Sequence, residues 1–233
     1  MVEIGGRPIL WHILKIYSHF GVRDFIICLG YRGYQIKEYF ANYVLHNSDV
    51  TVDISSNGLE YHSSMAEPWR VTLVDTGDDT MTGGRLKRIA HHVENESVFF
   101  MTYGDGVADI DLNALLAFHR SAGRLATMTV VSPPSRFGAV KVTDDRVTRF
   151  VEKPTGNDGH INGGFFVLSP ATLDLVKDDS TVWEGGPLRS LAASGELGAY
   201  RHDGFWLPMD TVRDRAILES LWSEPNPPWR IWG

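Results

Sequence analysis

Apolar residues along the chain follow two patterns that alternate. Between Ile9 and Phe20 they recur every three or four positions, with Pro8 before them and Gly21 just after, which predicts a helix. The next apolar run, at 25–29, is continuous, as in a strand covered on both faces. The same order repeats. Further strands are predicted at 71–74, 98–103, 125–131 and 165–168, and further helices at 34–46, 85–93, 112–120, from 187 and at 211–222.

Two hairpins interrupt this alternation. An Asn57-Gly58 pair amid alternating residues predicts one within 51–61, and a second is predicted within 139–152, turning at Asp144-Asp145. Strands alternating with helices of this length predict an α/β fold with a Rossmann-like, mostly parallel sheet, helices on both faces and antiparallel hairpin insertions. No repeat or linker divides the chain, so we expect a single domain over 1–233. At 224–233 it ends in a proline-rich tail, whose Trp229 and Trp232 we expect to pack.

Composition narrows the classes of function. Lys and Arg number 22 against 29 Asp and Glu, a formal net charge of -7, which disfavours nucleic acid and anionic membranes as partners. One cysteine, Cys28, excludes an internal disulfide framework, and no segment near Met1 has the pattern of a signal peptide. No apolar run reaches the length of a bilayer-spanning helix. We therefore expect a soluble, cytoplasmic protein.

The candidate chemistry centres on the end of one predicted strand. The strand at 98–103 leads into Gly104-Asp105-Gly106, and two more acidic residues, Asp109 and Asp111, follow. Open α/β sheets bind ligands at the carboxyl ends of their strands, and a carboxylate between two glycines suits Mg²⁺ that holds phosphate oxygens. The alternative is an ordinary turn, followed by a helix that Asp109 or Asp111 caps.

A second acidic candidate, Asp210, stands at the start of the last predicted helix. Its alternative role is an N-cap. If Asp105 and Asp210 converged on one cation, the pair would suit phosphoryl chemistry, in which Mg²⁺ is held by one or two carboxylates and by substrate phosphates.

Basic and amide groups complete the candidate set, each with a structural alternative. Thr82-Gly83-Gly84-Arg85 opens a helix whose amides and guanidinium could hold a phosphate, or it is a capped helix with a solvated Arg85. Lys153, at a predicted strand end, could meet a sugar phosphate or stay solvated. Ile161-Asn162-Gly163-Gly164 precedes the strand at 165–168 and suits sugar hydroxyls, or it is a tight turn.

Five segments together resemble the sugar-nucleotide pyrophosphorylases, in their order and spacing as well as in sequence. Within that family the chain is similar, over essentially all 233 residues, to the glucose-1-phosphate cytidylyltransferases, also called CDP-glucose pyrophosphorylases. The segments are Val2-Glu3-Ile4-Gly5-Gly6-Arg7-Pro8-Ile9, Tyr103-Gly104-Asp105-Gly106, Glu152-Lys153-Pro154, Asn162-Gly163-Gly164 and Pro208-Met209-Asp210-Thr211.

The resemblance implies the reaction of CTP with α-D-glucose 1-phosphate to give CDP-glucose and pyrophosphate, a supply for the dideoxyhexoses of bacterial surface polysaccharide such as the O-antigen of lipopolysaccharide. It implies that Asp105 and Asp210 hold Mg²⁺ and act in catalysis with Lys153. The same matching implies that Thr80, Arg85 and Gly104 contact the nucleotide. It implies that the sugar phosphate is contacted by Glu152, Lys153, Asn162 and Gly163. We also expect a homo-oligomer, since three tryptophans in the last twelve positions could form a surface between subunits.

The chain departs from the family at its beginning. The family starts with a strand, a glycine-rich turn and a Lys-Pro pair, and Met1 matches a position just after them. A strand with a phosphate-binding turn is about 25 residues long, and its loss would remove a backbone cradle for the triphosphate. We therefore expect the chain as written to have much reduced activity or none.

The sequence is also compatible with two other functions. The Asp109-Ile110-Asp111 spacing after a strand is typical of a metal-dependent glycosyltransferase that uses a nucleotide-sugar. A catalytically silent homologue that binds a sugar phosphate would keep the fold and the pocket without turnover.

Overall fold

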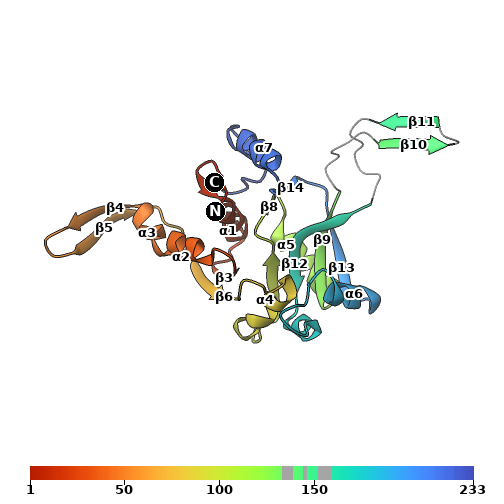
Figure 1. Cartoon of the computed structure of the whole chain (residues 1–233), viewed down its shortest axis with the longest axis horizontal. Coiled ribbons are helices and arrows are strands. Elements are labelled where there is room, and N and C mark those ends of the chain that lie inside the picture. Colours follow the sequence, from red (N-terminus) through yellow and green to blue (C-terminus); the bar gives the residue numbers. More distant parts are fainter. Residues whose placement is uncertain (133–138, 144–145, 152–158) are drawn as a thin grey trace. The chain divides into compact units, whose positions relative to one another are not determined.

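The structure of the protein is a computed structural model that describes residues 1–132, 139–143, 146–151 and 159–233, with side chains over 1–132 and 159–233 (Figure 1). The chain forms two compact units. The first consists of Met1, Tyr17–Ser97 and Pro170–Ser190, and the second of Val2–Ile16, Val98–Ser169 and Leu191–Gly233. The single-domain organisation expected from the sequence stays a prediction.

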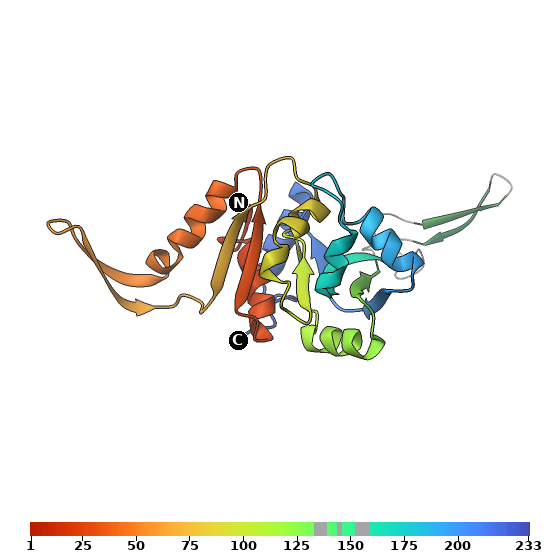
Figure 2. The same cartoon turned by 90° about the horizontal axis from the view of Figure 1, so that it is seen from below.

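The first unit is built on a parallel pair of strands, β3 (Asp24–Leu29) and β6 (Arg70–Asp75). Between them the chain forms the expected hairpin of β4 and β5, a ribbon that extends away from the pair in both views (Figures 1 and 2). Its turn places Asn57 at a φ of 55°, a left-handed conformation that asparagine tolerates. The remaining elements are α2 (Gly33–Ala41), α3 (Tyr43–His46), β4 (Ser48–Asp53), β5 (Gly58–Ser64), α4 (Thr82–Arg88) and the 3-10 helices η1 (Ala90–His92) and η2 (Pro170–Leu175).

The second unit contains a four-stranded sheet in the order β13-β9-β12-β7. Strands β9 and β13 are parallel, whereas β12 runs antiparallel to both of its neighbours. Helix α5 packs on this sheet (Figure 2). The bounds are β7 (Phe99–Thr102), α5 (Leu112–Ala122), β9 (Ala126–Val131), β12 (Ile161–Leu168) and β13 (Leu197–His202).

Shorter elements complete the second unit. The strands β8 (Gly106–Ala108) and β14 (Trp206–Pro208) form an antiparallel two-stranded ribbon, which we call the β8–β14 ribbon. The other elements are β1 (Glu3–Ile4), β2 (Arg7–Pro8), α1 (Ile9–His19), β10 (Ala139–Thr143), β11 (Arg146–Val151), α6 (Gly186–Ala193) and α7 (Val212–Trp222), of which α1 and α6 are shared with the first unit. The predicted turn at 144–145 lies outside the described residues.

The α/β fold class is confirmed, with parallel strand pairs in both units, and the sheet is more mixed than the alternating pattern indicated. Some boundaries were wrong: Asn162-Gly163-Gly164 lies inside β12 and not before it. The helix predicted at 34–46 is divided into α2 and α3, and the helix predicted at 85–93 is α4, which ends at Arg88, followed by η1. The β8–β14 ribbon was missed, because strands of three residues are too short to show a period.

Buried apolar side chains and the C-terminal tail form the core of the second unit. Phe165 to Leu168 of β12 are each at most 1% exposed, as are Leu112 and Leu115 of α5. The expectation for the tail is confirmed: Trp229 is fully buried and stacks on Trp222, and Trp232 packs edge-on against Trp11. The tail tryptophans therefore pack within their own unit.

Candidate active site

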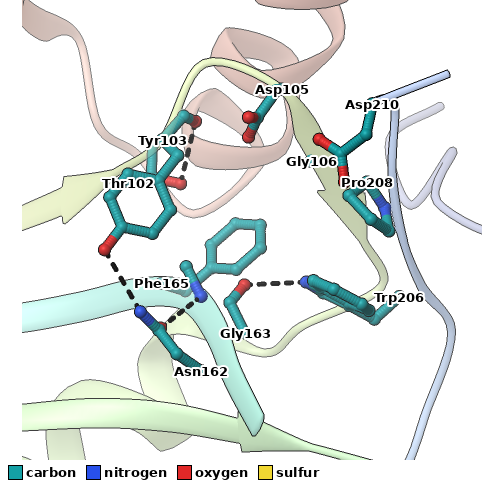
Figure 3. A pocket seen from close by; sticks show the side chains of 11 residues that line it. Thr102, Tyr103, Asp105, Gly106, Asn162, Gly163, Phe165, Trp206, Pro208 and Asp210 are labelled. Carbon is teal, nitrogen blue, oxygen red and sulfur yellow. Dashed lines mark hydrogen bonds between the residues drawn. The ribbon is translucent and has the colours of Figure 1, made fainter. Parts of the chain in front are cut away.

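The second unit contains an open cavity of about 180 Å³ next to the β8–β14 ribbon. Its walls come from the end of β7, the turn after it, the bulged start of β12, and β14 with the residues that follow (Figure 3). The lining residues are Thr102, Tyr103, Asp105, Gly106, Asn162, Gly163, Gly164, Phe165, Trp206, Pro208 and Asp210. Four of the predicted site residues, Asp105, Asn162, Gly163 and Asp210, thus share one cavity.

The β8–β14 ribbon brings the two acidic candidates together. Pro208 pairs with Gly106, and the backbone nitrogen of Met209 donates a 2.8 Å hydrogen bond to the carbonyl oxygen of Asp105. Figure 3 shows the carboxyl groups of Asp105 and Asp210 turned toward the same space. Desolvation of the Asp105 carboxyl raises its pKa above the ordinary 3.8, and the negative charge of Asp210 raises it further. A cation between them would relieve both effects.

Asp210 is not the N-cap of the last helix, so that alternative was wrong. Thr211 caps α7, since its side chain accepts a hydrogen bond from the backbone nitrogen of Asp214. The Asp214 carboxylate in turn accepts one from the backbone nitrogen of Thr211, which completes a capping box. Because Thr211 takes the capping role, the Asp210 carboxylate is available to the cavity.

A glycine bulge in β12 presents Asn162 to the cavity. The register of β12 against β9 shifts between Asn162 and Phe166, and Gly164 within this stretch has a φ of 79°. Gly163 packs closely as well, since a Cβ there would lie 2.9 Å from a methyl carbon of Val131. The Asn162 side-chain oxygen accepts a 2.9 Å hydrogen bond from the Gly164 nitrogen, which fixes the amide. The tight turn expected as the alternative is replaced by this bulge.

Two residues that the sequence analysis missed hold the bulge in place. The Asn162 amide nitrogen donates to the Tyr103 hydroxyl at 3.1 Å, and the Trp206 indole nitrogen donates to the Gly163 carbonyl oxygen at 2.7 Å (Figure 3). Each stands beside a motif, Tyr103 directly before Gly104 and Trp206 four positions before Asp210. Their nearness to these motifs could have identified them in the sequence. An aromatic residue at a strand end, however, is usually interpreted as part of the hydrophobic core.

The Asp109 and Asp111 carboxylates are engaged outside the cavity. Asp111 is the N-cap of α5 and accepts a 2.9 Å hydrogen bond from the Ala114 nitrogen, so the structural alternative is confirmed for it. An Asp109 oxygen lies 3.0 Å from the His202 ring nitrogen. The two carboxylates of the Asp-x-Asp motif therefore contact different partners.

Thr80 and Arg85 lie in the first unit, where Arg85 has a structural role. Its guanidinium donates to the Leu29 carbonyl at 2.9 Å and to the Thr76 hydroxyl at 2.7 Å, so it is not the solvated arginine of the alternative. Thr80 is 7% exposed and sits against Gly77, where a Cβ would lie 2.9 Å from its hydroxyl. Their nucleotide contacts stay predictions.

The first turn of α4 is covered by a neighbouring loop. The backbone nitrogens of Met81 and Gly84 donate to the carbonyl oxygens of Asp179 and Thr181. A Cβ at Gly83 would lie 2.7 Å from the Thr181 carbonyl oxygen, so the glycines allow this close packing. The Gly84 amide therefore already has a partner and Gly83 lies against the loop, so these two positions are not open to a phosphate.

Three further candidates remain at the stage of prediction. Gly104 lies in the turn before Asp105, and a Cβ there would meet no atom within 4 Å, so a ligand has room to approach the backbone. Glu152 and Lys153 lie outside the described residues, and their roles stay as the resemblance implies.

Comparison with known proteins decides the family. The family model described as nucleotidyl transferase matches residues 1–188 of the chain. The chain belongs to the nucleotidyl transferase family. This nucleotidyl transferase is 57% identical, over 232 residues, to the glucose-1-phosphate cytidylyltransferase of Salmonella typhimurium, with 100% of the chain and 90% of the relative covered. A Bacillus subtilis protein named "probable glucose-1-phosphate cytidylyltransferase" is 44% identical, with 100% of the chain and 91% of that protein covered.

A solved structure supports the fold of this nucleotidyl transferase. HddC of Yersinia pseudotuberculosis superposes with a TM-score of 0.69 at 19% identity, covering 96% of the chain and 89% of HddC. Within the described part of the chain, none of the helices combines the length and hydropathy needed to cross a bilayer.

The carboxylates in the cavity of this nucleotidyl transferase fit a metal ion that takes its other ligands from the substrate and from water. Over residues 1–132 and 159–233, no group of three or more His, Cys, Asp and Glu side chains is placed to bind a metal ion. Asp105 and Asp210 supply two carboxylates in one space, which is the usual protein share of a Mg²⁺ site that keeps phosphates and waters as its other ligands.

Proposed function

We propose that the chain catalyses transfer of a cytidylyl group from CTP to α-D-glucose 1-phosphate, giving CDP-glucose and pyrophosphate. The observation that carries the proposal is the 57% identity, across the entire chain, to a glucose-1-phosphate cytidylyltransferase. The geometry agrees with it, because the cavity combines two facing carboxylates with an oriented amide, the groups needed beside phosphates and sugar hydroxyls.

The reaction is an in-line substitution at phosphorus. A phosphate oxygen of glucose 1-phosphate attacks the α-phosphorus of CTP, a new P–O bond forms, and the bond to the β-phosphate oxygen breaks as pyrophosphate leaves. The step forms no covalent bond to the protein, so catalysis depends on positioning and on neutralising charge. Asn162 would orient the sugar through its fixed amide, since Tyr103 and Gly164 hold that amide from both ends.

We propose Mg²⁺ as the cofactor, with Asp105 and Asp210 as its protein ligands. When bound, it would offset the negative charge of the phosphates in the reaction. The raised pKa of Asp105 supports this proposal, because two carboxylates that repel each other in the absence of a cation gain most when one binds. Neither residue has a role in helix capping that would compete for its carboxylate.

We assign the other roles by the family resemblance. Thr80, Arg85 and Gly104 would contact the nucleotide, and Glu152, Lys153 and Gly163 would contact the sugar phosphate, with Lys153 acting in catalysis. A cytoplasmic location, a homo-oligomer, a contribution to O-antigen sugars and the absence of nucleic-acid and membrane partners also remain proposals. The net charge of -7 supports the last of these.

The test is pyrophosphate release from glucose 1-phosphate and Mg²⁺ with each of CTP, UTP, dTTP and ATP. We expect release with CTP and a CDP-glucose product by mass spectrometry. Asp105→Asn is the negative control and should be at background.

Two outcomes would overturn the proposal. Release of a free nucleoside diphosphate from a nucleotide-sugar would instead support a glycosyltransferase. Saturable binding of glucose 1-phosphate, with no release of pyrophosphate, would support a silent binding homologue.

A further inference from the structure

The β8–β14 ribbon is short, yet it decides where Asp105 and Asp210 lie. Its ladder runs from Trp206 opposite Ala108 to Pro208 opposite Gly106. Two short strands are marginally stable by themselves, and a slip of one residue turns every side chain to the other face. The separation of the two carboxylates therefore depends on whatever holds the register of this ribbon.

The end of the ribbon away from these carboxylates is closed by Asp109 and His202. His202 Nε2 lies 3.0 Å from Asp109 Oδ1 and 3.1 Å from the carbonyl oxygen of Phe205. The same carbonyl accepts a 3.2 Å hydrogen bond from the Asp109 backbone nitrogen. The Phe205 carbonyl is the hydrogen-bond acceptor for Nε2, and the Asp109 carboxylate oxygen lies beside the same ring nitrogen as a charged neighbour.

The contact is enclosed by the chain around it. The His202 side chain is 10% exposed and that of Asp109 is 34% exposed. A Cβ at Gly204 would collide with Asp109 Oδ1, so only glycine lets the loop between β13 and β14 approach so closely. Loop, histidine and carboxylate thus form one packed junction directly before Trp206.

We propose that Asp109 and His202 are a positioning pair. By holding Phe205 against the Asp109 backbone they set the register of the β8–β14 ribbon, and through it the separation of the Asp105 and Asp210 carboxylates. The inference rests on the proposed function for the role of those carboxylates. It also gives Asp109 a role that the Asp-x-Asp spacing did not indicate, because Asp109 neither lines the cavity nor caps α5.

The test compares His202→Ala and Asp109→Ala with a matched control in the same loop. Asp203→Ala removes a carboxylate that pairs with Arg201 at 2.7 Å in an exposed ion pair, and it leaves the His202 and Asp109 side chains in place. The first readout is Mn²⁺ binding to the protein alone by calorimetry. The second is hydrogen exchange of residues 205–210 by mass spectrometry.

We expect each variant of the pair to weaken Mn²⁺ binding about tenfold, the lower end of the effect of residues that orient metal ligands. Exchange at 205–210 should be faster, and the Asp203→Ala control should match the unmodified chain. His202→Gln keeps an N–H donor for the Phe205 carbonyl and should recover part of the binding. The double variant should lose little more than either single variant, because the two residues act together.

Unchanged exchange at 205–210 in both alanine variants would overturn the proposal, as would equal losses in the Asp203→Ala control. If the alanine variants do not fold, Asp109→Asn removes the charge and replaces one carboxylate oxygen by an amide nitrogen, and it should change metal binding and exchange in the same direction. Failure of the proposed function is a separate result: the unmodified chain would then release no pyrophosphate, while hydrogen exchange would still decide the role of the pair.

Discussion

The backbone nitrogen of Met209 donates a 2.8 Å hydrogen bond to the carbonyl oxygen of Asp105, although the two residues are more than a hundred positions apart. This bond continues the β8–β14 ribbon by one step, and the next residue is Asp210. The Asp105 and Asp210 carboxylates consequently lie at the same end of one ribbon, a relationship that gives the cavity its charge (Figure 3).

Replacement of Asp105 by Asn should lower the activity without lowering the stability of the folded chain. The raised pKa means that the folded state binds a proton at Asp105 more tightly than the unfolded state, so the charged carboxylate costs stability at neutral pH. We expect Asp105→Asn to lower kcat by about 100-fold or more, as loss of a charge-stabilising group does. Its midpoint of urea unfolding should be equal to or above that of the unmodified chain. A clearly lower midpoint would show that the carboxylate is structural.

Metal affinity should fall as the pH is lowered toward the raised pKa of Asp105. A proton and a metal ion compete for the same carboxylate, and the proton wins at a higher pH here than at an ordinary aspartate. Mn²⁺ titrations by calorimetry between pH 5 and pH 8 check this, with Asp203→Asn as the control for a carboxylate outside the site. An affinity independent of pH in this range would contradict the prediction.

Gly164→Ala should disturb the sugar side of the cavity. The new Cβ would lie 2.8 Å from Cδ2 of Tyr103, and the φ of 79° is unfavourable for alanine. We expect KM for glucose 1-phosphate to rise roughly tenfold, since small displacements of positioning groups are costly. Gly195→Ala is the matched control, because Gly195 has a φ of 77° with no atom within 4 Å of a Cβ. Equal effects of the two changes on KM would contradict the assignment.

His12 should make the free energy of unfolding depend on pH. Burial lowers its pKa to about 4, while its Nε2 donates to the Ile4 carbonyl at 2.9 Å and its Nδ1 accepts from the Trp229 indole. The unfolded chain therefore binds a proton at His12 between about pH 6.5 and pH 4 and the folded chain does not. This stabilisation is complete above pH 6.5, and about 3 kcal/mol of it is lost as the pH falls to 4.

Urea unfolding at several pH values measures this loss. His12→Gln cannot titrate and keeps a donor for Ile4, so it should lose about 3 kcal/mol less than the unmodified chain between pH 7 and pH 4. Identical pH profiles for the two proteins would show that His12 does not contribute.

Local patterns determined much of this protein from the sequence alone. The helix starting at Ile9, the apolar strand that became β3 and the Asn57-Gly58 turn were each predicted, because periodicity and turn preferences act over a few neighbouring residues. The glycines on both sides of Asp105 also indicated a site residue, because a carboxylate in that turn is not needed for local structure, and Asp105 does line the cavity.

Only the tertiary structure decided which residues meet. The ribbon that joins Asp105 to Asp210 consists of strands too short to show a period, so their convergence could not be derived from spacing. Thr211, and not Asp210, caps α7, because two neighbouring polar residues can each serve as an N-cap and packing chooses between them. The partners of Asn162, Gly163 and Asp109 lie 59, 43 and 93 positions away, and such distant contacts form only when the sheet brings strand ends together.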